Sequence, residues 1–152
     1  MDFTVFNTVL AGVLTYVAGQ IVVKLLLEPI QEMRRTIGQV SHSLIEHANV
    51  IGNPGVASPE VMSATAKELR KLSSQLQSHL YLVPSYKYTA KLFRMPSQDQ
   101  VLVASKYLIG LSNSVHRSTG GVYEQNAFRV EKICDALSIY MSDDERISMV
   151  EE

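Results

Sequence analysis

The stretch from Phe3 to Val23, FTVFNTVLAGVLTYVAGQIVV, carries no charged residue. The apolar run resumes after Lys24 with three leucines and stops at Glu28. A helix rises about 1.5 Å per residue, so about 20 residues cross a hydrocarbon layer of roughly 30 Å. The sequence therefore predicts a transmembrane helix over residues 1–28.

This stretch has two other interpretations. A secretory signal begins with basic residues and has a shorter apolar centre, whereas this chain starts Met1-Asp2, so cleavage is not expected. A buried core helix is the stronger alternative, because threonine, glycine, Asn7 and Gln20 dilute the hydrophobicity. A core helix in so small a domain would rarely avoid every charge, so we favour the spanning helix.

The basic residues near this helix predict its orientation. Lys24, Arg34 and Arg35 follow it, whereas Asp2 precedes it. Because basic residues stay on the cytoplasmic side, we expect an outside N-terminus and a cytoplasmic C-terminal domain.

Small and polar residues recur at steps of three and four within the span, which places them on one side of a helix. We assign close helix packing to Ala11, Gly12, Thr15 and Gly19, with Thr8 beside them. Asn7 and Gln20 are assigned interhelical hydrogen bonding or the polar lining of a pore. Lys24 would form a cationic mouth. The stripe is compatible with a lone anchor that tolerates weak polarity. We favour homo-oligomeric packing, with a dry bundle preferred to a water-lined ring.

Composition excludes several function classes. The chain of 152 residues carries 14 basic and 15 acidic residues, which gives no global electrostatic argument for binding nucleic acid. Cys134 is the single cysteine, which excludes an intramolecular disulfide and a paired-cysteine metal site. Phosphate loops and zinc motifs do not occur, so we expect neither a cofactor nor a metal.

The remainder of the chain predicts an all-α fold: residues 29–142 form a bundle of four to five helices, followed by an acidic tail over 143–152. Apolar residues at helical spacing place helices at about 30–51, 58–83, 85–93, 97–115 and 122–141. Ser58 and Ser97 have the positions of N-caps, and Gln100 completes a capping box. Pro29 predicts a hinge where the first helix leaves the membrane.

Arg35 and His42 are the candidate catalytic residues. Seven positions apart, they share a helix face with Gln39 and Glu46, and their spacing resembles the catalytic signature of the HEPN-type ribonucleases, which are dimeric all-α bundles. The signature is loose, and an ordinary solvated helix face is the preferred interpretation. We interpret His116 as a cation in the last turn of a helix, where it suits the helix dipole, and find no metal spacing around His47 or His79.

The segment from Tyr81 to Arg94 mixes aromatic and basic residues, with no acid between Pro84 and Pro96. Such a segment could stack on single-stranded RNA or DNA, or lie on anionic lipid headgroups. Packing of the tyrosines beneath a solvated basic rim is the interpretation we prefer. Cys134 lies on the apolar stripe of its helix and is expected in the core.

Two resemblances extend these expectations. The residues Glu28-Pro29-Ile30-Gln31-Glu32, with Asn53-Pro54 and Leu108-Ile109-Gly110-Leu111-Ser112 later, resemble a group of short bacterial proteins of unassigned function with one N-terminal membrane helix. The layout of a span followed by an all-α domain with an Arg-x6-His pair is also similar to the accessory membrane protein found beside type VI-B CRISPR effectors. That similarity implies a multi-subunit membrane pore in antiphage defence.

The expected protein is thus a single-pass component of a bacterial inner membrane, in contact with lipid and with further copies of itself. A regulated pore is one form of such an assembly. A membrane-tethered ribonuclease and a passive adaptor for a cytoplasmic protein or RNA partner are the alternatives.

Overall fold

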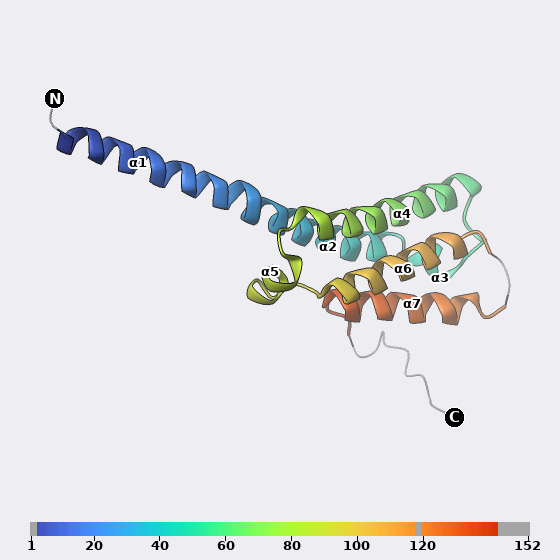
Figure 1. Cartoon of the computed structure of the whole chain (residues 1–152). Helices are drawn as coiled ribbons and strands as arrows, with labels where there is room; N and C mark the ends of the chain where they lie inside the picture. Colours follow the sequence, from blue (N-terminus) through green and yellow to red (C-terminus); the bar gives the residue numbers. More distant parts are fainter. Residues whose placement is uncertain (1–2, 118–119, 143–152) are drawn as a thin grey trace.

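The computed structural model describes residues 3–117 and 120–142, and within these ranges the chain is helical without a strand. The elements are α1 (Phe3–Val22), the π-helical turn η1 (Val23–Leu27), α2 (Glu28–Glu46), α3 (Ala48–Gly52), α4 (Pro59–Leu82), α5 (Tyr86–Leu92), α6 (Gln98–Ser114) and α7 (Val122–Leu137). The prediction of an all-α fold with a long apolar N-terminal helix is confirmed. Figure 1 shows α1 projecting as a rod from a bundle formed by the other helices.

The first three elements form one continuous helix from Phe3 to Glu46, so no new helix begins at Pro29. A proline within a helix lacks an N–H and clashes with the carbonyl of the preceding turn. Here the turn before Pro29 is π-helical, and the Glu28 N–H donates to the Val23 carbonyl five residues earlier. The wider turn accommodates the proline ring without a break, and the rod therefore continues directly into the bundle.

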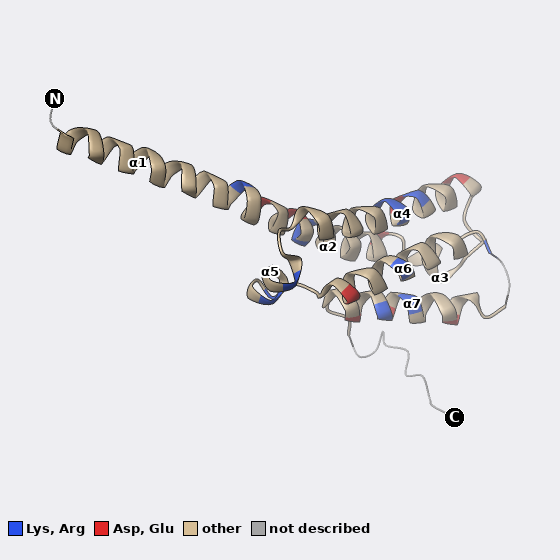
Figure 2. Ribbon diagram, viewed as in Figure 1, with Lys and Arg blue, Asp and Glu red and all other residues tan. Residues whose placement is uncertain are grey.

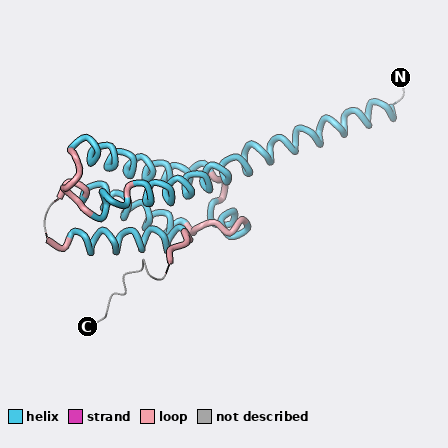
Figure 3. The backbone as a smooth tube through the Cα atoms, turned by 180° about the vertical axis from the view of Figure 1, so that it is seen from behind, coloured by secondary structure: helices cyan, strands magenta, loops and turns pink. Residues whose placement is uncertain are grey.

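The long helices α2, α4, α6 and α7 alternate in direction and enclose a single main core (Figures 1 and 3). The predicted antiparallel pairing of α2 with α4 is seen in both views. The core contains side chains that are almost completely buried on each of these helices, among them Met33, Val40, Leu69, Leu72, Leu76, Val101, Leu108, Leu111 and Ile133. Cys134 is also buried, as predicted.

The capping signals in the sequence are confirmed. The Ser58 hydroxyl accepts a hydrogen bond from the Val61 N–H, and Pro59 occupies the first turn of α4. At the start of α6, Ser97 accepts from the Gln100 N–H, and the Gln100 side chain accepts from the Ser97 N–H at 2.7 Å. These bonds satisfy N–H groups that a helix leaves without intrahelical partners.

Two predicted helix boundaries are wrong. The helix expected over 30–51 stops at Glu46, and α3 begins after His47; the break turns Ala48 outward and buries Val50 and Ile51. The last helix ends at Leu137, short of Met141, because Ser138 adopts a left-handed conformation (φ 56°) and Ile139 N–H donates to the Cys134 carbonyl. The predicted acidic tail, 143–152, lies outside the described residues.

Candidate functional site: the apolar helix and its junction with the bundle

The helix α1 lies entirely outside the core. None of its residues is buried, and Figure 1 shows no other described element beside it. It belongs to the one helix in the described residues that is long and apolar enough to cross a membrane. The alternative of a buried core helix is therefore wrong for this chain.

The predicted stripe of small and polar residues lies open on the rod. The Thr8 hydroxyl donates to the Thr4 carbonyl at 2.8 Å, and the Thr15 hydroxyl donates to the Ala11 carbonyl at 2.9 Å. A Cβ atom placed on Gly12 or Gly19 would meet nothing within 4 Å. The stripe is consequently a shallow surface on which a second backbone can approach closely.

Asn7 and Gln20 differ from the two threonines. Among the described residues neither amide side chain makes a hydrogen bond, whereas both threonine hydroxyls are satisfied within their own helix. By helical geometry Asn7 lies at the edge of the stripe near Ala11, and Gln20 lies on its other flank beyond Gly12. Asn7 thus borders the surface of small residues, whereas Gln20 lies on an adjacent side of the helix.

Among the described residues, charge begins on the bundle side of α1. In Figure 2 neither the acidic nor the basic colour appears on α1 itself; the first cation along the described rod is Lys24, in η1. Arg34 and Arg35 follow on α2, with Glu28 and Glu32 between them and Lys24. The rod therefore changes from apolar to charged within the π-helical turn and the first turns of α2.

The structure places the candidate catalytic pair on the outer face of α2. Arg35 donates to Glu32 at 3.2 Å, and His42 lies 3.4 Å from Glu46; the side chains of Arg35 and His42 are 69% and 78% exposed. The two residues have different carboxylate partners and make no contact with each other among the interactions of the described chain. This arrangement is that of a solvated helix face on which each side chain contacts a nearby carboxylate.

The structure also shows where the other three histidines lie. His79 is buried, shares a hydrogen bond of 2.9 Å with the Thr36 hydroxyl, and has its pKa lowered by burial, an effect that Glu32 opposes. The His47 Nδ1 lies 3.3 Å from the Thr65 hydroxyl. His116 follows α6, which ends at Ser114, so its expected place in the last turn is wrong. The described residues contain no cluster of three potential metal ligands.

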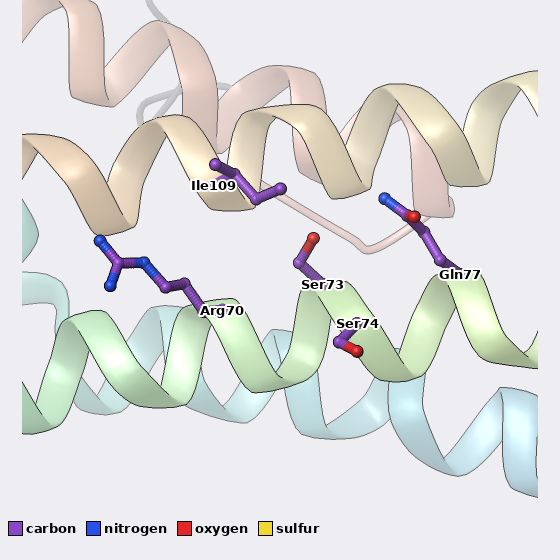
Figure 4. Close-up of a pocket in the computed structure, with 5 residues that line it drawn as sticks. All are labelled: Arg70, Ser73, Ser74, Gln77 and Ile109. Atoms are coloured by element: carbon purple, nitrogen blue, oxygen red, sulfur yellow. The ribbon is translucent and has the colours of Figure 1, made fainter.

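A shallow hollow of about 320 Å³ lies between α4 and α6, lined by Arg70, Ser73, Ser74, Gln77 and Ile109 (Figure 4). Arg70, Ser73 and Gln77 join the two helices through their side chains. The Ser73 and Ser105 hydroxyls lie 2.6 Å apart, Gln77 donates to Ser105, and Arg70 donates to Ser112. We interpret this hollow as part of a polar helix contact rather than as a binding site.

The segment around α5 corrects an expectation. Tyr86 is buried, donates its hydroxyl to the Pro96 carbonyl at 2.8 Å, and has its pKa raised to about 12 by burial. Tyr81 and Tyr88, however, are 90% and 75% exposed, so these two tyrosines do not pack in the core. The preferred interpretation, tyrosines packed beneath a basic rim, is wrong for both.

Asn126 was not identified from the sequence, although it is completely buried. Its amide donates to the Ile51 carbonyl at 2.9 Å, and its oxygen lies 2.6 Å from the Ser114 hydroxyl and accepts from Arg129 at 2.9 Å. It thereby joins α3, α6 and α7. The only sequence signal for this junction was a polar residue at a position of α7 that faces the core.

Comparison with known proteins adds no family. No protein-family model, curated protein or solved structure gives a significant match to the chain.

Proposed function

We propose that the protein is a membrane-anchored helical protein that self-associates through α1, with its N-terminus outside the cytoplasm and its bundle inside a bacterial cell. One observation carries the proposal: α1 is an apolar rod with no buried residue, and it projects away from the bundle. In water this exposed apolar surface would be unfavourable, because burial contributes about 25 cal/mol per Å² of apolar area. A bilayer provides the missing apolar surroundings.

The proposed self-association rests on the stripe. Residues Thr8, Gly12, Thr15 and Gly19 follow steps of four, three and four, the spacing that keeps one face turned toward a neighbouring helix in a left-handed pair. Lipid offers no hydrogen-bond partner to the Asn7 and Gln20 amides, whereas a second copy of α1 does.

The internal bonds of the two threonine hydroxyls favour a dry helix contact over a water-lined channel. A hydroxyl that is already bonded to its own backbone gains less from water, so the polarity of the stripe is lower than its composition suggests. The proposed assembly is therefore a dry bundle, and a pore is the second form to be tested.

Disulfide scanning in membranes tests the contact. On a Cys134→Ala background, Thr15→Cys and Val17→Cys lie at nearly the same depth but about 200° apart around the helix, and Thr8→Cys with Leu10→Cys repeats the comparison. We expect rapid disulfide-linked dimers for Thr8→Cys and Thr15→Cys, and little for the matched pair. Equal cross-linking at all four positions, or a preference for Val17 and Leu10, would refute packing through the stripe.

Liposome leakage separates a pore from an anchor. Protein reconstituted into vesicles with an entrapped dye is expected to leave the dye inside if the bundle is dry. Leakage that disappears in the Asn7→Leu and Gln20→Leu variants would favour the pore, the form that the resemblance to the type VI-B accessory protein implies for antiphage defence. Arg35 and His42 are exposed and contact separate carboxylates, which gives no comparable support to the ribonuclease alternative.

A further inference from the structure

We propose that the outer face of α5 is a second membrane contact, which lies on the headgroups of an anionic bilayer beside the point where α1 emerges. This inference rests on the proposed insertion of α1. The face consists of Tyr88, Leu92, Lys87 and Lys91 on α5, together with Tyr81 and Leu82 at the end of α4, and all six side chains are exposed.

Position in the fold is the first argument. Figures 1 and 3 both place α5 at the end of the bundle from which the α1 rod emerges, away from the far end that carries α3 and the start of α7. If α1 crosses a bilayer, this end of the bundle faces the membrane surface, and α5 lies to one side of the rod.

The chemistry of the face is the second argument. Leu92 and Tyr88 are both 75% exposed and Leu82 is 58% exposed, which leaves large apolar groups in water beside two lysines. Tyrosine concentrates at membrane interfaces because its ring is apolar and its hydroxyl polar. Lysine extends its charged end to headgroups while its stem covers apolar surface. Apolar and basic residues together are the composition of an interfacial helix.

Charge complementarity selects the lipid. The interval from Pro84 to Pro96 holds Lys87, Lys91 and Arg94 and no acid, and Figure 2 shows the basic colour on α5. An anionic leaflet attracts such a cluster. A nucleic-acid surface would need the same cations, but it would not require them at the membrane end of the bundle.

The segment is fixed rather than free, so the face keeps its direction. The buried side of α5 packs Tyr86 and Ala90 into the main core. Arg34, in the second turn of α2, donates to the Phe93 carbonyl at 2.8 Å, and the Met95 N–H donates to the Ala90 carbonyl to close the end of α5. The outer face is thus held in a fixed orientation relative to the helix that leads to the membrane.

The chain has no tryptophan, so a single substitution gives a unique fluorescent reporter. Full-length Tyr88→Trp is reconstituted into vesicles of phosphatidylcholine with phosphatidylglycerol, and quenching by brominated lipid is measured. Phe6→Trp reports on α1, and Tyr123→Trp, which is 60% exposed at the start of α7, reports on the far end of the bundle. We expect quenching at positions 6 and 88 and none at position 123.

A matched pair of charge variants tests the role of the lysines. Lys87→Gln with Lys91→Gln is compared with Lys67→Gln and Lys71→Gln, which remove two cations from α4. Each cation near an anionic surface raises the equilibrium constant for docking about fivefold. Removal of two cations should therefore lower the ratio of docked to undocked α5 by about thirtyfold and abolish quenching of the Tyr88→Trp reporter. The α4 variant should leave that quenching unchanged.

The outcomes distinguish the two proposals. Quenching at position 6 without quenching at position 88 overturns the α5 contact and leaves the anchor standing, whereas no quenching at position 6 removes the anchor itself. Emission of the Tyr88→Trp reporter that responds to a single-stranded RNA oligonucleotide and not to lipid would identify a nucleic-acid surface and overturn the inference. Quenching at position 88 that persists in the Lys87→Gln, Lys91→Gln variant would overturn the choice of an anionic lipid.

Discussion

Replacement of Asn126 by alanine should be among the most destabilising polar substitutions in the bundle. Asn126 is 0% exposed, and its removal breaks the bond to the Ile51 carbonyl and the bond from Arg129. The Ser114 hydroxyl keeps a partner, because it also lies 2.8 Å from the Leu111 carbonyl. The loss is therefore one orphaned buried carbonyl and one charge-assisted bond.

A buried polar group left without a partner costs about 1 to 3 kcal/mol. A hydrogen bond to a charged group contributes about 1.5 to 3 kcal/mol. The bond from Arg129 contributes less than this because it is only partly buried. Alanine returns about 0.6 kcal/mol of helix propensity. We expect Asn126→Ala to lower the free energy of unfolding by about 2 to 3 kcal/mol.

The assay is guanidinium denaturation of the full chain in detergent, followed by circular dichroism. Asn113→Ala is the matched control, because it removes an exposed bond from Arg70, gains the same helix propensity and should stay within about 0.5 kcal/mol of the unmodified chain. An Asn126→Ala variant as stable as Asn113→Ala would show that the three-helix junction does not depend on this amide.

Two further predictions concern the same bundle. Ser97→Ala should lower the free energy of unfolding by about 1 kcal/mol through loss of the capping box, measured by denaturation against the exposed control Ser78→Ala; an equal effect of the two would contradict it. The pKa of His79 is lowered in the folded chain, so just below pH 6.5 the unfolded chain binds more protons than the folded chain. The free energy of unfolding should therefore fall as the pH drops through 6.5. His79→Gln should flatten this dependence when denaturation is measured at a series of pH values. An unchanged pH profile in His79→Gln would assign the dependence to other groups.

Local chemistry made much of the fold predictable. The serines at positions 58 and 97 precede their helices by the spacing that capping requires, and the structure forms both caps. The uncharged stretch from Phe3 to Val23 could be identified as a separate rod because its length and composition are independent of tertiary contacts. A cap depends on neighbours within four residues, and an apolar stretch depends on its own composition. The sequence displays both directly.

Features set by tertiary context were missed. Ser138 ends α7 in a left-handed conformation, although no glycine marks the position, and the turn before Pro29 is π-helical. Tyr86 and Tyr88 lie two residues apart, and only packing against the main core decides which of them is buried. The same limit applied to Asn126, whose partners come from separate helices.

The proposed anchor requires that α1 hold the chain in a membrane. Cells expressing the full chain are broken, the envelope is pelleted and washed in alkaline carbonate, and the protein is followed by immunoblot. We expect it to stay in the washed pellet and to be released only by detergent, with Leu14→Asp plus Val17→Asp shifting it toward the soluble fraction. Recovery of the unmodified chain in the soluble fraction would contradict the account.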